Sequence, residues 1–134
     1  MEKKTQIKTQ ALGKNIRVSV SKMRRIIDRI RNTSYEESLV LLEFMPYRAS
    51  YLVSQLVVSA AANASTNLGL NKSNLFISEA WANNSTYLRR FRPRAQGRGY
   101  PIKKPICEVT IKLSSKIVKK INRNCISHIV SDNY

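Results

Sequence analysis

The first clear pattern in the chain is a helical repeat of apolar residues that begins just after Ser19. Over residues 20–31, apolar residues recur every three or four positions, so a helix would carry them on one face. These positions are Val20, Met23, Ile26, Ile27 and Ile30. The opposite face holds Lys22, Arg25 and Arg29, with Arg24 and Arg31 flanking the apolar stripe. We predict a helix with Ser19 as its N-cap and a basic face that binds phosphate; the alternative is an ordinary solvated surface.

Two more helices are predicted before the middle of the chain. Ser34 and Glu37 have the spacing of a capping box, so a short helix should begin there and end before Pro46. A longer apolar series follows and ends at Gly69, a typical C-terminal stop. Its members are Ala49, Leu52, Val53, Leu56, Val57, Ala60 and Ala64. Because this series is continuous, we expect it to be core and not a cofactor site.

After residue 74 the apolar period changes from helical to two. Residues 75–81 alternate as a strand does, and extended character is expected to continue to Phe91. Residues 107–113 alternate more cleanly, with Cys107, Val109, Ile111 and Leu113 on one side. A weak alternation through Leu12, Lys14 and Ile16 predicts one short strand after a basic arm. With 134 residues, the chain has room for one domain.

Net charge is the property that most restricts the possible partners. The chain has 24 Lys and Arg against 8 Asp and Glu, a net charge of +16, and therefore attracts polyanions. Nucleic acid, an anionic membrane and an acidic protein are the candidate partners. No run of apolar residues in the sequence approaches the ~20 residues that a membrane-spanning helix needs, so we expect no membrane partner. No secretory signal or transit-peptide composition is visible, so we expect the protein to work where it is made.

The residues that carry catalysis or hold metals are scarce. Cys107 and Cys125 have no CxxC partner, so they fit neither a zinc site nor a disulfide scaffold, and we expect Cys107 to lie in the core. His128 is the only histidine, and the carboxylates are dispersed. We therefore expect no catalytic residue, no metal and no cofactor, and we predict that the chain is not an enzyme.

The segment from Leu88 to Lys104 is the strongest functional signal. It holds seven basic residues and no acidic one, together with two of the four glycines and two of the four prolines. Arginine pairs with phosphate oxygens and stacks on bases, and glycine lets the backbone approach nucleic acid closely. Phe91 and Tyr100 lie among the arginines and are suited to stack on bases. The alternative is a solvated basic loop.

Several motifs resemble one known family. The run from Pro93 to Ile102, PRAQGRGYPI, looks like the hairpin-tip signature of the large-subunit ribosomal protein conventionally numbered twenty-two. Residues 19–31, EFMPYRA at 43–49 and SAAANA at 59–64 resemble the same family in the same order, so the likeness spans roughly residues 12–113. The variants at 45–48 and 99–101 resemble its plastid branch, as does a composition rich in Asn, Ile, Lys and Ser. We expect a chloroplast ribosome, with the bacterial cytoplasm as the alternative.

The resemblance implies an α+β fold: three helices packed on a small antiparallel sheet, with a long protruding β-hairpin. We divide the single domain into a basic arm and short strand (1–18), three helices (19–74), the hairpin (75–113) and a basic tail (114–134). The implied function is structural: binding ribosomal RNA, aiding subunit assembly, and lining the nascent-peptide exit tunnel with the hairpin tip. The implied partners are large-subunit ribosomal RNA, neighbouring ribosomal proteins and the nascent polypeptide.

The candidate residues follow from charge, from aromatic character and from position in the family pattern. The candidate RNA-binding residues are Lys14, Arg17, Lys22, Arg24, Arg25, Arg29, Arg89, Arg90, Phe91, Arg92, Arg94, Gln96, Arg98, Tyr100, Lys103 and Lys104. The candidate tunnel-tip residues are Leu88, Arg89, Arg90, Pro93, Arg94, Ala95, Gln96, Gly97 and Arg98. The rival hypothesis is a free-standing basic architectural protein that binds DNA or RNA, although no helix pairs a basic face with a clear dimerisation stripe.

Overall fold

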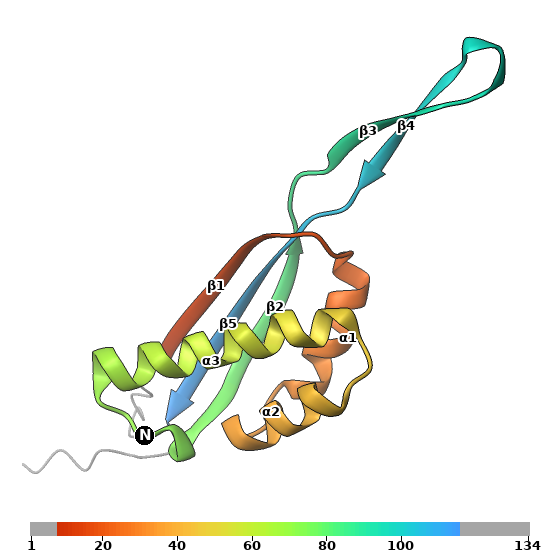
Figure 1. The fold of residues 1–134 in the computed structure, drawn as a ribbon. Helices are drawn as coiled ribbons and strands as arrows, with labels where there is room; N and C mark the ends of the chain where they lie inside the picture. The colour runs from red at the N-terminus through yellow and green to blue at the C-terminus, as the bar shows by residue number, and fades with distance from the viewer. Residues whose placement is uncertain (1–7, 116–134) are drawn as a thin grey trace, which may run out of the picture.

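The computed structural model describes residues 8–115. Their elements, labelled in Figure 1, are β1 (Lys8–Ile16), α1 (Val20–Ile30), α2 (Tyr35–Phe44), α3 (Arg48–Leu68), the 3-10 turn η1 (Lys72–Asn74), β2 (Leu75–Asn84), β3 (Leu88–Pro93), the 3-10 turn η2 (Ala95–Gly97), β4 (Gly99–Lys104) and β5 (Cys107–Ser115). The fold is α+β with three helices, as the resemblance implied. Residues 1–7 of the predicted basic arm and residues 116–134 of the predicted tail, with Cys125 and His128, lie outside the described residues.

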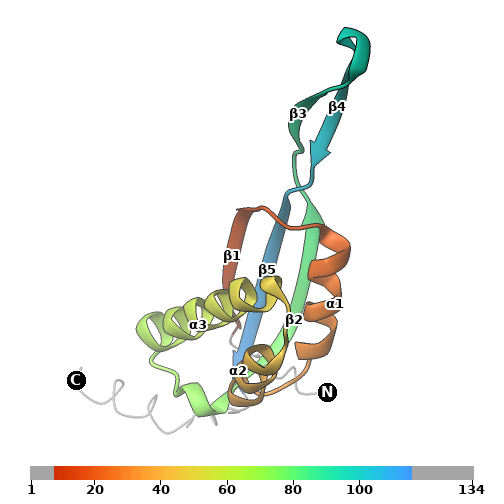
Figure 2. The same cartoon turned by 45° about the vertical axis from the view of Figure 1, so that its right-hand side comes forward.

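The strands form two antiparallel sheets. β5 is the central strand of a three-stranded sheet with the order β1-β5-β2, and β3 pairs with β4 in a separate two-stranded ribbon. This ribbon, which we call the hairpin (residues 88–104), projects from one end of the three-stranded sheet (Figures 1 and 2). It extends well clear of the helices.

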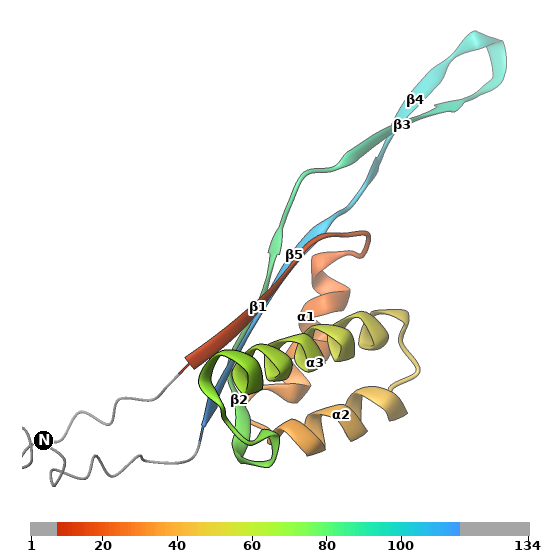
Figure 3. The same ribbon diagram turned by 60° about the vertical axis from the view of Figure 1, so that its left-hand side comes forward.

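The helices cover one face of the three-stranded sheet (Figure 3). All five predicted apolar positions of α1 are buried, and so are Val53, Val57, Ala60 and Ala64 of α3. Leu52 and Leu56, which were also predicted as core, are only partly buried. From the sheet, the alternating residues of β5 complete the core, among them the predicted Cys107. The period in the sequence therefore identified the buried faces correctly.

The predicted helix ends are largely confirmed. Glu37 N donates to Ser34 Oγ at 3.3 Å and Ser34 N donates to Glu37 Oε2 at 3.2 Å, which is the predicted capping box. Gly69 ends α3 in the left-handed conformation, with a φ of 61°. Ser19 does occupy the N-cap position of α1, but its hydroxyl lies 3.0 Å from Ser21 Oγ and does not cap the helix. The start of α1 is therefore left without a side-chain cap.

Residues 75–81 lie in a strand and the chain is extended again up to Phe91, as predicted, but the strand is interrupted at residues 85–87, which the sequence prediction did not anticipate. Asn84 pairs with Cys107 and Leu88 pairs with Lys104, so three residues on one arm face only two on the other. Pro105 has no amide hydrogen and cannot continue the ladder, while Ser85 N donates to the carbonyl of Ile106 at 3.1 Å. Only β3 and β4 therefore protrude, and β2 and β5 belong to the body of the protein.

The two outer strand boundaries also differ from the sequence prediction. β1 is nine residues long instead of short, and it starts at Lys8 inside the predicted arm. A bulge between Gly13 and Ile16, with Asn15 at a φ of 58°, obscures its alternation. At the other end β5 runs to Ser115, two residues past Leu113.

Candidate nucleic-acid interface

The hairpin carries a dense set of exposed cations. Its register pairs Leu88 with Lys104 and Pro93 with Gly99. Three arginines lie on β3, two lie at the tip, and two lysines lie on β4. Every residue from Arg89 to Pro105 is exposed. Within residues 8–115, the structure shows no ion pair on any of these cations. The hairpin is therefore a positively charged ribbon that is not neutralised within the described chain.

The tip has a fixed turn geometry. Gln96 and Gly97 both have positive φ, 59° and 69°, and Arg94 N donates to the carbonyl of Arg98 at 2.7 Å. Arg94, Ala95, Gln96, Arg98 and Tyr100 surround a shallow hollow of about 620 Å³. Left-handed backbone is unusual for glutamine, so this tight turn is a strained feature at the far end of the ribbon. The structure thus brings the candidate tip residues 94–98 together.

Phe91 and Tyr100 are the two aromatic residues of the hairpin, and both are exposed, by 71% and 54%. The Phe91 ring lies across the ribbon over Gly99: a Cβ added to Gly99 would be 1.7 Å from Phe91 Cζ and 1.9 Å from Cε2. Only glycine leaves this space open. The hairpin therefore supports one edge of the ring and leaves most of its surface available for stacking.

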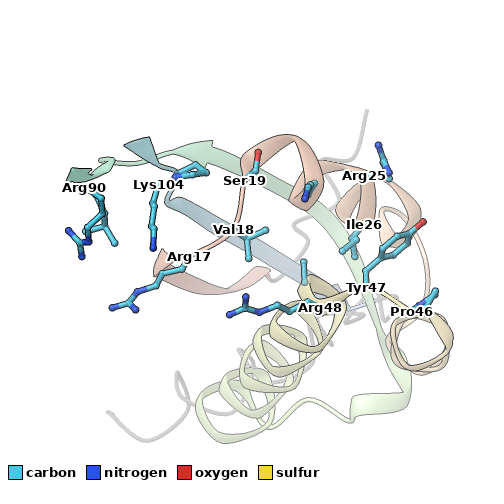
Figure 4. Close-up of a pocket in the computed structure, with 14 residues that line it drawn as sticks. Arg17, Val18, Ser19, Arg25, Ile26, Pro46, Tyr47, Arg48, Arg90 and Lys104 are labelled. Carbon is cyan, nitrogen blue, oxygen red and sulfur yellow. The ribbon is translucent and has the colours of Figure 1, made fainter. Parts of the chain in front are cut away.

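A second cluster of cations surrounds a cavity of about 810 Å³ at the base of the hairpin (Figure 4). The turn after β1, the first turns of α1 and α3, and the two arms of the hairpin all contribute to its wall. Its basic residues, which we call the basic cradle, are Arg17, Lys22, Arg25, Arg48, Arg90 and Lys104. Val18, Ile26, Ala49 and Leu88 give the cavity an apolar lining. Elements far apart in sequence thus place six cations around one hollow.

Two helices start at this cavity, α1 at Ser19 and α3 at Tyr47, and neither has a side-chain cap. The first amides of a helix have no partner within the helix, and the helix dipole adds positive potential there. Such ends bind phosphate oxygens readily. Arg48 in the first turn of α3 opposes this dipole unless an anion lies beside it. The cradle therefore has the charge, the amides and the shape to hold nucleic-acid phosphates.

The sequence prediction missed Arg48, although it noted the residue as part of the EFMPYRA motif. The signal was a basic residue, with no acidic one, in the first turn of a helix, where an acidic side chain is normally favoured. Conversely, part of the Arg24 guanidinium is used within the protein, since its Nε donates to the carbonyl of Ala82 at 3.2 Å. Lys14 and Arg29 are exposed but line neither the cradle nor the hairpin. Arg89, Arg92, Arg94, Arg98 and Lys103 lie along the hairpin.

Two lysines of the sheet, unlike those of the hairpin, share a carboxylate. Glu79 accepts hydrogen bonds from Lys8 Nζ at 2.6 Å and Lys112 Nζ at 2.9 Å. These two bonds lower the pKa of Glu79 from 4.5 to about 2, and the bond from Lys8 has the larger effect. Burial raises the pKa of the Cys107 thiol, so this cysteine is protonated and unreactive. The densest groups of cations without an ion pair in the described range are therefore the cradle and the hairpin.

A metal-binding group and a membrane-spanning helix are both absent from the described residues. Residues 8–115 contain no group of three His, Cys, Asp or Glu side chains placed to hold a metal ion. None of the helices in this range combines the length and apolar character needed to cross a membrane.

The chain resembles known ribosomal proteins over most of its length. The family model described as "Ribosomal protein L22p/L17e" matches residues 11–114. The large ribosomal subunit protein uL22c of Adiantum capillus-veneris is 79% identical over 117 residues, which cover 87% of this chain and 96% of that protein. The proteins of the same name from Cycas taitungensis and Physcomitrium patens are 57% and 56% identical, over 81% and 84% of this chain and 78% and 96% of theirs. The chain belongs to the L22p/L17e family of ribosomal proteins.

Proposed function

We propose that this ribosomal protein binds large-subunit ribosomal RNA through the basic cradle and the hairpin, aids subunit assembly, and lines the nascent-peptide exit tunnel with the hairpin tip. The cradle is the observation that carries the proposal, because six cations and two uncapped helix starts meet at one cavity. No enzyme activity is proposed, since the family consists of ribosomal proteins. Family membership also argues against a free-standing architectural protein.

The mechanism is phosphate neutralisation at two places. At the cradle, helix amides and the side chains of Arg25, Arg48 and Lys104 would hold backbone phosphates and fix the orientation of the body on the RNA. Along the hairpin, the arginines would contact phosphates of RNA segments on both sides, and Phe91 and Tyr100 would stack on unpaired bases. RNA would thereby supply the anions that both clusters lack.

The tunnel-lining role is proposed for residues 93–98 at the hairpin tip. Leu88, Arg89 and Arg90, which the sequence also placed at the tip, pair with residues 102–104 at the base of the hairpin, where Leu88 and Arg90 line the cradle. The hairpin is narrow and stands clear of the body, so it can enter a passage in RNA that the body cannot (Figure 2). Its tip is a compact turn with a hollow lined by Arg94, Gln96 and Tyr100. A nascent polypeptide passing this tip is the proposed partner, and neighbouring ribosomal proteins are proposed partners of the body.

We propose a chloroplast ribosome as the location. The support is the high identity to the uL22c proteins of Adiantum, Cycas and Physcomitrium. The bacterial cytoplasm, the alternative from sequence, is less well supported by these relatives.

Binding to large-subunit RNA as a function of salt tests the cradle. A protein that neutralises about 6–10 phosphates should lose several decades of affinity between low and moderate salt. The double variant Arg25→Gln, Arg48→Gln should reduce the slope of log affinity against log salt by about 2. Lys72→Gln is the control, because Lys72 is exposed in η1 and lies outside the cradle. Equal slopes for the double variant and the wild type would remove the cradle from the interface.

A further inference from the structure

α2 differs from the rest of this basic protein. It is the only helix of residues 8–115 without a basic residue, and it holds three of the chain's eight acidic residues, Glu36, Glu37 and Glu43. Its outer surface is apolar as well, since Val40 is 53% exposed and Phe44 is 83% exposed. These two side chains are one helical turn apart and thus lie together. An exposed phenylalanine on a folded body is a large apolar surface without a partner in the described chain.

A groove between α2 and α3 lies beside this surface, with Glu43 in its lining. The groove has a volume of about 560 Å³ and is lined by Leu39, Leu42, Glu43, Ser50, Tyr51, Ser54, Gln55 and Val58. Tyr51 is 65% exposed and Val58 is 46% exposed, and Gln55 Nε2 donates to the Tyr51 hydroxyl at 2.8 Å. We call the exposed apolar residues and the two carboxylates beside them, Glu36, Val40, Glu43, Phe44, Tyr51 and Val58, the α2–α3 face. Figure 3 shows α2 as the helix farthest from the sheet.

The carboxylates of this face are set apart by their lack of partners. Four of the six acidic residues within 8–115 are engaged: Asp28 with Arg31, Glu79 with Lys8 and Lys112, Glu108 with Ser85, and Glu37 in the α2 cap. Glu36 and Glu43 are the remaining two, and the structure gives them no partner within the described range. Both flank the exposed Val40. In a chain of net charge +16, the only carboxylates left unpaired in this range surround its exposed apolar helix surface.

We infer that the α2–α3 face docks a lysine- or arginine-bearing segment of another large-subunit protein, with an apolar side chain seated in the groove. The carboxylates would pair with the cations of that segment, Tyr51 and Val58 would cover the apolar side chain in the groove, and Phe44 would contact the segment beside it. RNA is disfavoured here because Glu36 and Glu43 repel phosphates. A second copy of the chain is disfavoured because a symmetric contact would bring the same carboxylates together.

Photo-crosslinking in assembled large subunits tests the occupant. A benzophenone side chain is placed at Phe44 and, as the matched control, at Phe91 of the hairpin. The expected product at position 44 is a crosslink to a basic segment of another large-subunit protein, identified by mass spectrometry. A crosslink to RNA, a crosslink to residues 116–134 of this chain, or no crosslink would overturn the inference. The inference is independent of the RNA interface proposed above: failure of the Phe91 probe to reach RNA would count against that interface alone.

Charge reversal tests the chemistry of recognition. In the double variant Glu36→Lys, Glu43→Lys, the protein crosslink from position 44 should fall about tenfold, because two attractions become repulsions. The isosteric variant Glu36→Gln, Glu43→Gln should give an intermediate yield. The Gln variant should leave the thermal midpoint of the free protein nearly unchanged, because the two carboxylates make no described contact. The Lys variant should lower this midpoint slightly, because Glu36 lies in the first turn of α2, where the helix dipole favours an acidic side chain. An unchanged crosslink yield in the charge-reversed subunits would contradict docking by a basic segment.

Discussion

At the residue scale, the Phe91 ring packs closely against Gly99, where no other residue would leave room for it. The ring occupies the space of the absent Cβ, so the hairpin holds one edge of an exposed aromatic group that would otherwise rotate freely. Once RNA orders the hairpin, the ring is held in one orientation, in which a base can stack on it. Packing against the Phe91 ring therefore explains the glycine at position 99, whereas a positive φ explains the glycine at position 97.

A double-mutant cycle tests this contact. Gly99→Ala should displace the ring and weaken binding to large-subunit RNA by about tenfold, whereas in a Phe91→Ala background the same change should cost little. The measurement is the dissociation constant at one fixed salt concentration. Equal costs in both backgrounds would show that Gly99 acts through the backbone and not through the Phe91 ring.

Glu79 gives the protein a defined acid sensitivity. Its pKa is about 2 in the folded protein and near 4.5 when unpaired, so its contribution to stability is complete above about pH 4.5 and is lost as the pH falls toward 2. Chemical denaturation between pH 6 and pH 2 should show the free energy of unfolding falling in this window. Glu79→Gln should weaken the dependence of the free energy of unfolding on pH, while the control Glu43→Gln should leave this dependence unchanged. A wild-type profile that is flat below pH 4.5 would contradict the ion-pair assignment.

At the scale of elements, the division between body and hairpin follows from burial. Val57 in α3 is fully buried, whereas its neighbour Val58 is 46% exposed. Val57→Asp should destabilise the protein by more than about 4 kcal/mol, because it buries a charge without a partner. Val58→Asp, the matched control, should change stability by less than about 1 kcal/mol. Thermal unfolding followed by circular dichroism measures both, and similar losses for the two variants would mean that α3 is packed differently.

Shortening the hairpin is the complementary test. Arg90 pairs with Ile102, so an Asn-Gly turn can replace residues 91–101 and close a shorter ribbon in register. The body should keep its thermal midpoint because these residues are all exposed. In assembled subunits, crosslinks between this protein and a nascent chain should disappear. Crosslinks that persist would show that the tip does not line the tunnel.

The sequence predicted some elements far better than others. α1 was predicted with its complete core face, because five large apolar residues in a strict helical period leave no other arrangement. β1 and the join between β2 and β3 were predicted less well, since a bulge near Asn15 and the missing amide of Pro105 change the pairing without changing the apolar period. The hairpin cations were visible as a run in the sequence. The cradle was not, because tertiary packing brings Arg17, Arg48 and Lys104 together from three separate segments.

At the scale of the whole molecule, the charge is divided between two surfaces of different purpose. The cradle and hairpin present cations, which we propose bind RNA, while the α2–α3 face presents carboxylates and apolar side chains. In the sheet, Glu79 forms ion pairs with both Lys8 and Lys112. Such a division would let a small protein bind RNA on one side and protein on another, with the body holding the two at a fixed relative orientation.

The last prediction is that RNA, and not the protein itself, orders the hairpin. A two-stranded ribbon alone is marginally stable in water, and here every side chain from Arg89 to Pro105 is exposed. The irregular residues 85–87 also separate its ladder from the stable three-stranded sheet. Seven basic residues repel one another along it, so the entropy lost on ordering is poorly opposed without phosphates.

Amide hydrogen exchange on the free protein and on assembled subunits measures this order. The amides of residues 107–113 should be protected in both states, because β5 is the central strand of the sheet and has a buried face. The amides between Arg90 and Lys103 should exchange fast in the free protein and slowly in the subunit. Residues 107–113 serve as the internal control for folding. Strong protection of the hairpin amides in the free protein would mean that the ribbon supports itself, and RNA would then bind a rigid, preformed arm.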